Sequence, residues 1–242
     1  MDEFEPHLSI DDCKNDVLRM LGTVASNADF LLPWPSVYCI YDTFDPTDET
    51  DENYASAVSF CDTVRREMPQ YSDYANKIWA IFLEKRAAFE PYYHTLPQAS
   101  FQSDLSYSNV LVDGTKQFAG VLDFNLSGTI CVLAMLVLPE ACGFNLLLSD
   151  LERLGTQAFR DECDARVREN LRAVARHYAF TDIEREAFSL CWNTIFPFCY
   201  YMIHGLLAHA IKAQNAERVG AVLDWVLHQL TRNDLALPAA SF

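Results

Sequence analysis

The chain of 242 residues is half apolar and 13% aromatic, enough to bury the core of a folded domain, and this excludes a disordered chain. Its formal net charge of −16 disfavours nucleic acid and membrane surfaces as partners, because Lys and Arg are the residues that neutralise phosphates. The same negative field would attract a cationic small molecule.

The first 98 residues are predicted to form leading helices. Ser9, with Asp12 three positions later, resembles a capping box, and apolar residues follow at helical spacing as far as Val24. Two later apolar faces, Tyr54 to Met68 and Tyr71 to Phe89, predict a pair of helices that pack together. The acidic N-terminal residues lack the basic start and apolar core of a secretion signal, so a cytoplasmic protein is expected.

An acidic segment, Asp42 to Asn53, separates the first helix from the second. It contains six carboxylates but lacks the spacing and central Gly of an EF-hand loop, so we expect a solvated loop rather than a calcium site. The eight cysteines of the chain include no Cys-x-x-Cys pair. They are expected to be reduced and mostly buried thiols, as in a cytoplasmic chain.

The run from Asp104 to Asn109 is the most informative part of the sequence. Two β-type apolar runs follow it, joined by the turn signal Asp113-Gly114, and the second run ends at Asp123. In phosphoryl transfer, one Asp accepts the proton of the attacking hydroxyl, a following Asn binds Mg²⁺, and a later Asp joins the metal to phosphate. A second Asp-x-x-x-x-Asn, Asp48 to Asn53, has no hairpin behind it. The order of the elements therefore favours a functional site over a chance hairpin.

Residues 99–125 resemble the catalytic segment of the aminoglycoside phosphotransferase family, which includes antibiotic, choline and homoserine kinases with a protein-kinase-like fold. The resemblance implies Asp104 as the catalytic base and Asn109 and Asp123 as Mg²⁺ ligands. It also implies ATP as the phosphate donor and a small molecule as the acceptor.

The expected fold is α+β, mostly α: a helical, kinase-like C-terminal lobe in which a small β-hairpin carries the catalytic segment. We expect a single domain over residues 1–242. Its leading helices occupy residues 1–98, its catalytic loop and hairpin occupy 99–125, and a helical subdomain occupies 126–242.

The sequence departs from the family pattern on both sides of the loop. Family members carry His-Gly before the catalytic Asp, where this chain has Gln102 and Ser103. Gln can form hydrogen bonds but cannot titrate. Beyond the metal-binding Asp, the carboxylates usual in the family are replaced in the run Gly128 to Ala134.

A strand-rich lobe that would cover ATP is not predicted. The chain has no Gly-x-Gly, and Lys14, its only Lys before residue 77, falls in a helical pattern rather than in a strand. The residues that precede Asp104 are already assigned to helices, which leaves no room for a five-stranded sheet.

Apolar helices are predicted after the hairpin. Ile130 to Leu138 is expected to be a buried helix, because it is far shorter than the ~20 residues that span a bilayer. Helical spacing continues from Leu147 to Tyr178, and two helices are expected over residues 183–213 and 216–232. Aromatic and polar residues gather from Trp192 to His209, and we expect a hydroxylated or amine-bearing acceptor to bind between them and the catalytic loop.

Two functions of different class remain open. The first is an ATP- and Mg²⁺-dependent phosphotransferase acting on a hydroxyl of a small molecule, with an N-terminal lobe that is lost, reduced or supplied by a second chain. The second is a degenerate kinase-like binding protein or remnant without turnover. Retention of Asp104, Asn109 and Asp123 favours the first, and loss of the strand Lys and of a His at position 102 favours the second.

Overall fold

The structure, a computed structural model, describes residues 10–27, 29–41, 51–115, 117–138, 148–199 and 201–239. These residues are mostly helical and contain two small antiparallel sheets, so the predicted class, α+β and mostly α, is confirmed. Ser9, Cys142 and most of the acidic segment, residues 42–50, lie outside the described residues, and the predictions for them stay predictions.

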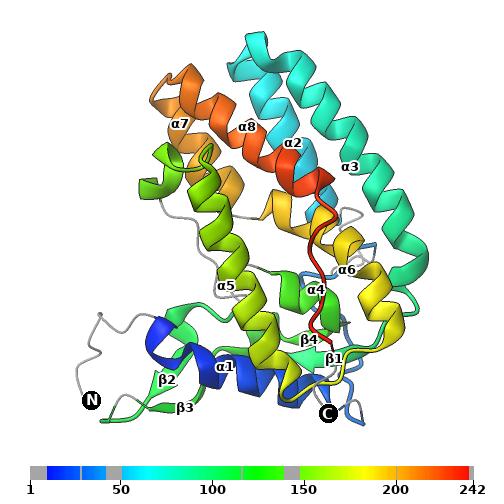
Figure 1. Cartoon of the computed structure of the whole chain (residues 1–242). Coiled ribbons are helices and arrows are strands. Elements are labelled where there is room, and N and C mark those ends of the chain that lie inside the picture. The colour runs from blue at the N-terminus through cyan, green and yellow to red at the C-terminus, as the bar shows by residue number, and fades with distance from the viewer. Residues whose placement is uncertain are drawn as a thin grey trace.

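The elements follow the chain order helices, sheets, helices. The described helices are α1 (Ile10–Ala25), α2 (Glu52–Glu67), α3 (Ser72–Tyr93), α4 (Val132–Val137), α5 (Gln157–Ala175), α6 (Asp182–Ile195), α7 (Ala208–Lys212) and α8 (Ala216–Thr231). The strands are β1 (Gln98–Phe101), β2 (Val110–Val112), β3 (Phe118–Val121) and β4 (Gly128–Cys131). The long helices α2 and α3 lie side by side at one end of the molecule, as predicted, and the sheets lie at the other end beside α1 (Figure 1).

Side-chain caps explain where the longer helices begin. Asp51 accepts a hydrogen bond from the Tyr54 amide at 2.8 Å and starts α2. Thr181 and Glu184 form a complete capping box at the start of α6. The prediction of a solvated acidic loop is wrong at Asp51, because this carboxylate is mostly buried and pairs with Arg86 at 2.8 Å.

The two sheets flank the predicted catalytic segment. β1 pairs with β4, with Gln98 opposite Cys131, and β2 pairs with β3, with Val110 opposite Val121. The predicted hairpin is thereby confirmed. Asp113 holds its turn by accepting hydrogen bonds from the Thr115 hydroxyl at 2.7 Å and from the amides of Gln117 and Thr115 at 3.0 and 2.8 Å. These bonds lower the pKa of the Asp113 carboxyl, the hydroxyl bond most of all.

Two predicted helices differ from the structure. Ile130 and Cys131 belong to β4 rather than to a helix, because their backbones pair with β1; the buried helix α4 begins only at Val132. The helix expected over residues 183–213 ends at Ile195, where Pro197 interrupts it, and a π-helix, Tyr201–Leu207, precedes α7.

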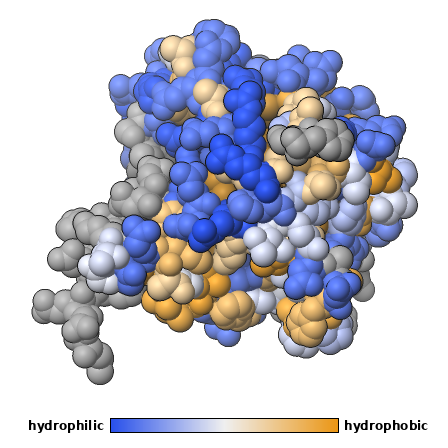
Figure 2. Space-filling view, turned by 60° about the horizontal axis from the view of Figure 1, so that its bottom comes forward, coloured by the Kyte–Doolittle hydropathy of each residue, from blue (hydrophilic) through white to orange (hydrophobic). Residues whose placement is uncertain are grey.

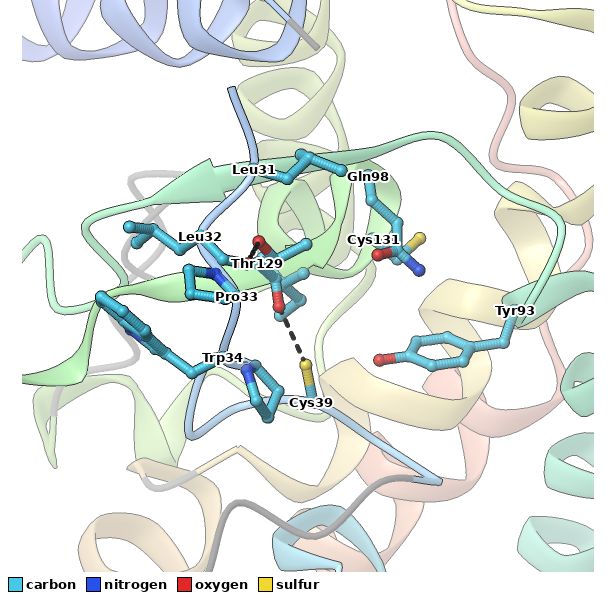
Figure 3. A pocket seen from close by; sticks show the side chains of 11 residues that line it. Leu31, Leu32, Pro33, Trp34, Cys39, Tyr93, Gln98, Thr129 and Cys131 are labelled. Carbon is cyan, nitrogen blue, oxygen red and sulfur yellow. Dashed lines mark hydrogen bonds between the residues drawn. The ribbon is translucent and has the colours of Figure 1, made fainter. Parts of the chain in front are cut away.

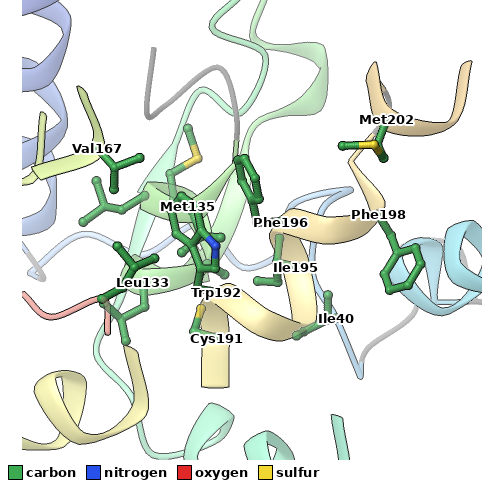
Figure 4. Close-up of a cluster of buried hydrophobic side chains, with 14 of the residues drawn as sticks. Ile40, Leu133, Met135, Val167, Cys191, Trp192, Ile195, Phe196, Phe198 and Met202 are labelled. Atoms are coloured by element: carbon green, nitrogen blue, oxygen red, sulfur yellow. The ribbon is translucent and has the colours of Figure 1, made fainter. Parts of the chain in front are cut away.

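The core takes residues from all the long helices and from the β1–β4 sheet, and Figure 4 shows the part where α4, α5, α6 and the turn after α6 meet. Trp192 and Phe196 stack there with ring centroids 4.2 Å apart. The run Asp182–Lys212 has the length and apolar composition of a membrane span, and 62% of its most apolar window is buried inside the fold. Core packing accounts for that composition.

The seven described cysteines are free thiols, and all but Cys199 are buried, as predicted for reduced thiols. Burial raises the pKa of Cys61, Cys131 and Cys163 to about 12, so these three remain neutral near pH 7.

A strap, defined here as residues 31–39, runs beside β4 and extends the sheet. The Thr129 amide donates to the Trp34 carbonyl, and the Ser36 amide donates to the Thr129 carbonyl, each at 3.0 Å. Gly128 permits this approach, since a Cβ atom there would lie 2.3 Å from the carbonyl carbon of Pro35.

Candidate active site

Asp104 and Asn109 lie in the loop that joins β1 to β2. The Asn109 side-chain amide donates to the Asp104 backbone carbonyl at 3.0 Å and to the Asp104 carboxylate at 2.9 Å. Asn109 is buried and Asp104 is partly exposed, so the amide fixes the direction of a carboxylate that a substrate can reach. Because Asn109 Nδ2 is engaged with Asp104, its Oδ1 is the end of the amide that can face a cation.

Asp123 lies just beyond β3 in a left-handed conformation, with φ 56° and ψ 77°. Asp is among the residues that tolerate this region, and here the conformation turns the chain sharply after the strand. The Asp123 side chain is exposed and accepts a hydrogen bond from the Asn125 amide at 3.3 Å. The neighbouring Leu122 amide donates to the Asn109 carbonyl at 2.8 Å, which ties the two loops together.

The buried side chain of Gln102 connects the two loops of the site. Its side-chain nitrogen lies 2.7 Å from the Asp104 carbonyl oxygen, 3.0 Å from that of Leu122 and 2.8 Å from that of Asp123. One buried amide group therefore joins the loop that carries Asp104 to the loop that carries Asp123. The loop is thus supported at position 102 by an uncharged donor.

Ser103 connects the catalytic loop to the strap. Ser36, fully buried in the strap, donates through its hydroxyl to the Ser103 hydroxyl at 2.8 Å. Sequence reasoning missed Ser36, because 67 residues separate it from its partner and no motif surrounds it. The nearest signal was Ser103 itself, a polar residue where the family pattern has Gly.

The structure links the backbones of the two loops that carry Asp104, Asn109 and Asp123, through Gln102 and through the Leu122 amide, and the donor atoms of these side chains suit a hard cation. Asp123 and Asn109 offer one carboxylate and one amide oxygen, and Mg²⁺ in nucleotide sites typically takes one or two carboxylates plus the phosphates. Within the described part of the chain, no group of three or more His, Cys, Asp or Glu side chains could hold a metal ion. The donor set therefore fits a metal held jointly with a phosphate-bearing ligand rather than by the protein alone.

Exposed apolar side chains lie on two segments next to this site, the turn after β3 and the strap. Of the seven large hydrophobic side chains exposed in the described residues, two follow β3, Leu122 at 44% and Phe124 at 61%, and three lie in or just before the strap: Phe30, Leu31 and Trp34. The Trp34 indole donates to the Ser127 carbonyl at 3.0 Å, which joins the two groups. We call these five residues the apolar rim. Apolar side chains are also prominent at this end of the molecule in Figure 2.

The acceptor site expected near Trp192 to His209 is wrong for three of its aromatic residues, while Tyr200 and the Tyr201 side chain lie outside the described part of the chain. Trp192, Phe196 and Phe198 are buried in the core, and the Trp192 indole donates to Gln229 at 2.9 Å. Helix α7, which carries His209, lies at the end of the molecule opposite the hairpin (Figure 1). Aromatic residues at helical spacing marked the core here rather than a cleft.

Comparisons of the chain with protein-family models, with curated proteins and with solved structures found no match. The case for a reaction at this site therefore depends on the loop residues themselves: a buried brace, a carboxylate oriented by an amide, and a second exposed carboxylate beside it.

The role of Gln102 can be tested by Gln102→Glu. At pH 7 this change places a carboxylate against three carbonyl oxygens and leaves those of Leu122 and Asp123 without the Gln102 donor, so we expect the free energy of unfolding to fall by about 3 kcal/mol. Burial raises the pKa of the new carboxyl in the folded state, so the deficit relative to wild type should shrink as the pH falls and the group protonates.

Chemical denaturation between pH 4 and 8 provides the measurement. Gln70→Glu is the matched control, because Gln70 is exposed and remote from the loop. Equal losses in the two variants, or a loss independent of pH, would show that Gln102 does not hold the loops together.

Proposed function

We propose that this chain is an ATP- and Mg²⁺-dependent phosphotransferase that acts on a hydroxyl of a small molecule. The observation that carries the proposal is the Asn109 to Asp104 hydrogen bond of 2.9 Å beside Asp123, with one amide bracing both loops. Pairing of β1 with β4 and of β2 with β3 around the loop supports a kinase-like C-terminal lobe.

Each site residue has one role in this proposal. Asp104 accepts the proton of the acceptor hydroxyl as its oxygen bonds to phosphorus, while the bond to the nucleoside diphosphate breaks. Asn109 holds the Asp104 carboxylate in place, and its Oδ1 together with Asp123 would bind Mg²⁺. The ion, when bound, offsets the negative charge of the phosphates.

The acceptor class follows from charge. A net charge of −16 favours approach of a cation, so an aminoalcohol or amino sugar suits the chain better than an anionic acceptor. The free thiols support a cytoplasmic location.

The proposal includes a second chain that supplies the phosphate-covering lobe. Before β1 the described residues form three long helices, and Lys14 lies in α1 rather than in a strand. The apolar rim offers a surface on which such a lobe would dock. Lys or Arg side chains of that lobe would complement the negative charge of this chain and bind the phosphates.

A binding protein without turnover is the second candidate. The lack of a basic phosphate clamp among the described residues of the site favours it, because metal ligands alone hold a nucleotide poorly. In that case Asp104, Asn109 and Asp123 would keep their geometry while no phosphate is transferred.

The isolated chain is expected to bind Mg²⁺-ATP weakly, because it contributes metal ligands but no cover over the nucleotide. Isothermal titration calorimetry, with Asp123→Ala as the variant that removes a full charge opposite the cation, measures this directly. Asn109→Ala should weaken binding less than Asp123→Ala, since it removes a neutral ligand. Submicromolar affinity would mean that this chain contains a phosphate clamp of its own.

Asp104→Asn tests the chemistry. It preserves the shape of the side chain but removes the base, so phosphoryl transfer to an aminoalcohol panel should fall at least ~10²-fold. Asp73→Asn, an exposed change in the first turn of α3, should leave the rate unaltered. Transfer of the γ-phosphate of ³²P-ATP is the readout. Wild-type turnover in Asp104→Asn would exclude Asp104 as the base. Absence of transfer by the wild-type chain alone is expected both for an enzyme that needs the lobe of a second chain and for the binding protein.

A further inference from the structure

A cavity of about 290 Å³ lies between the strap, the β1–β4 sheet and the end of α3 (Figure 3). Strap residues 31–35 and Cys39 form one wall, the sheet forms the second, and Tyr93 closes the space from α3. Leu31 and Trp34 of the apolar rim line it, but none of the residues that would hold the metal or act on the substrate does. The cavity is therefore distinct from the proposed phosphoryl-transfer site.

The lining is neutral. It contains no Asp, Glu, Lys, Arg or His, and its polar groups are an amide, two hydroxyls and two thiols, from Gln98, Thr129, Tyr93, Cys39 and Cys131. Burial raises the pKa of the Cys131 thiol to about 12, so this group stays uncharged near pH 7. A charged ligand would lose its hydration without gaining a countercharge, and the lining therefore selects a neutral molecule.

Shape and size narrow the ligand further. Two leucines and two prolines of the strap supply apolar surface, whereas the Trp34 ring lies on the side of the strap away from Gln98 and Tyr93 (Figure 3). A cavity of roughly 150 Å³ holds one benzene ring. The present cavity is about twice as large, which matches a molecule of two fused rings.

We propose that this cavity is a binding site for a small neutral aromatic molecule of two fused rings, packed against the prolines of the strap and hydrogen-bonded at its polar edge to Gln98. The site does not depend on the proposed phosphotransferase activity, and its ligand class differs from the cationic acceptor.

A ligand in this cavity would contact the part of the fold that anchors the catalytic loop. The Thr129 hydroxyl donates to the Leu32 carbonyl at 2.8 Å, so the cavity wall is fixed to β4. In the same strap, Ser36 bonds to Ser103, the residue that precedes Asp104. Ligand binding in the cavity should therefore change the environment of the Ser103 amide as well as that of the cavity wall.

The test is a ¹H–¹⁵N NMR titration of the whole chain with indole as the probe. We expect saturable shifts at the amides of Leu31, Leu32, Thr129 and Cys131, with a smaller shift at Ser103. Benzylammonium and benzoate, a cation and an anion with one ring each, should bind at least tenfold more weakly. The single-ring neutral compound benzyl alcohol is included to separate the effect of charge from the effect of size.

Gln98→Trp serves as the blocking variant. Gln98 lies opposite Cys131 in the sheet, so a larger ring there would project over the cavity and lower indole affinity at least tenfold. Gln70→Trp, the same change at a distant exposed position, should leave affinity unaltered. Non-saturable shifts, equal binding in both variants, or binding of benzylammonium as tight as that of benzyl alcohol would each overturn the proposal. Because the readout is binding alone, an inactive phosphotransferase site would not affect the result.

Discussion

The geometry of the site depends on one buried side-chain amide. Gln102 Nε2 lies within hydrogen-bonding distance of carbonyl oxygens on both sides of the hairpin, at Asp104 and at Leu122 and Asp123. Buried carbonyl groups without a donor cost free energy, so this amide stabilises two loop ends that otherwise have few regular partners. A charged or apolar side chain of the same size would not supply these bonds.

Two further constraints keep the braced loop in place. The Ser36 to Ser103 bond fixes it to the strap, and the strap in turn lies against β4 only because Gly128 has no side chain. Hydrogen bonds of this kind are individually modest, but they connect three segments that are far apart in sequence. The catalytic loop is therefore held by hydrogen bonds to the strap, and the strap is held by backbone hydrogen bonds to β4.

Local pattern predicted the parts of the fold that local interactions determine. Asp113 and Gly114 identified the hairpin because the turn is stabilised by its own side chain, and the apolar faces of α2 and α3 identified a packed pair. The run around Ile130 was misassigned because an apolar stretch has no period that separates a buried strand from a buried helix. Pairing with β1 decided the outcome there.

The sequence predicted which residues form the candidate site, but it did not predict the long-range hydrogen bonds that hold them in place. The spacing of Asp104, Asn109 and Asp123 indicated that they would meet, and the hairpin brings the backbones of their two loops together. Ser36 could not be found this way, because its role arises from a long-range contact. Trp192 illustrates the opposite error, since aromatic residues on an apolar helix face are more often core than ligand-binding.

The central claim is that Asp104, Asn109 and Asp123 form one cation site. Mn²⁺ in place of Mg²⁺, added at substoichiometric levels with a non-hydrolysable ATP analogue, broadens NMR signals of nearby amides. The account predicts that broadening is strongest at residues 104–109 and 122–125 and that it is lost in Asp123→Ala while Asp113→Asn retains it. Broadening spread over other acidic surfaces, or unchanged in Asp123→Ala, would contradict the account.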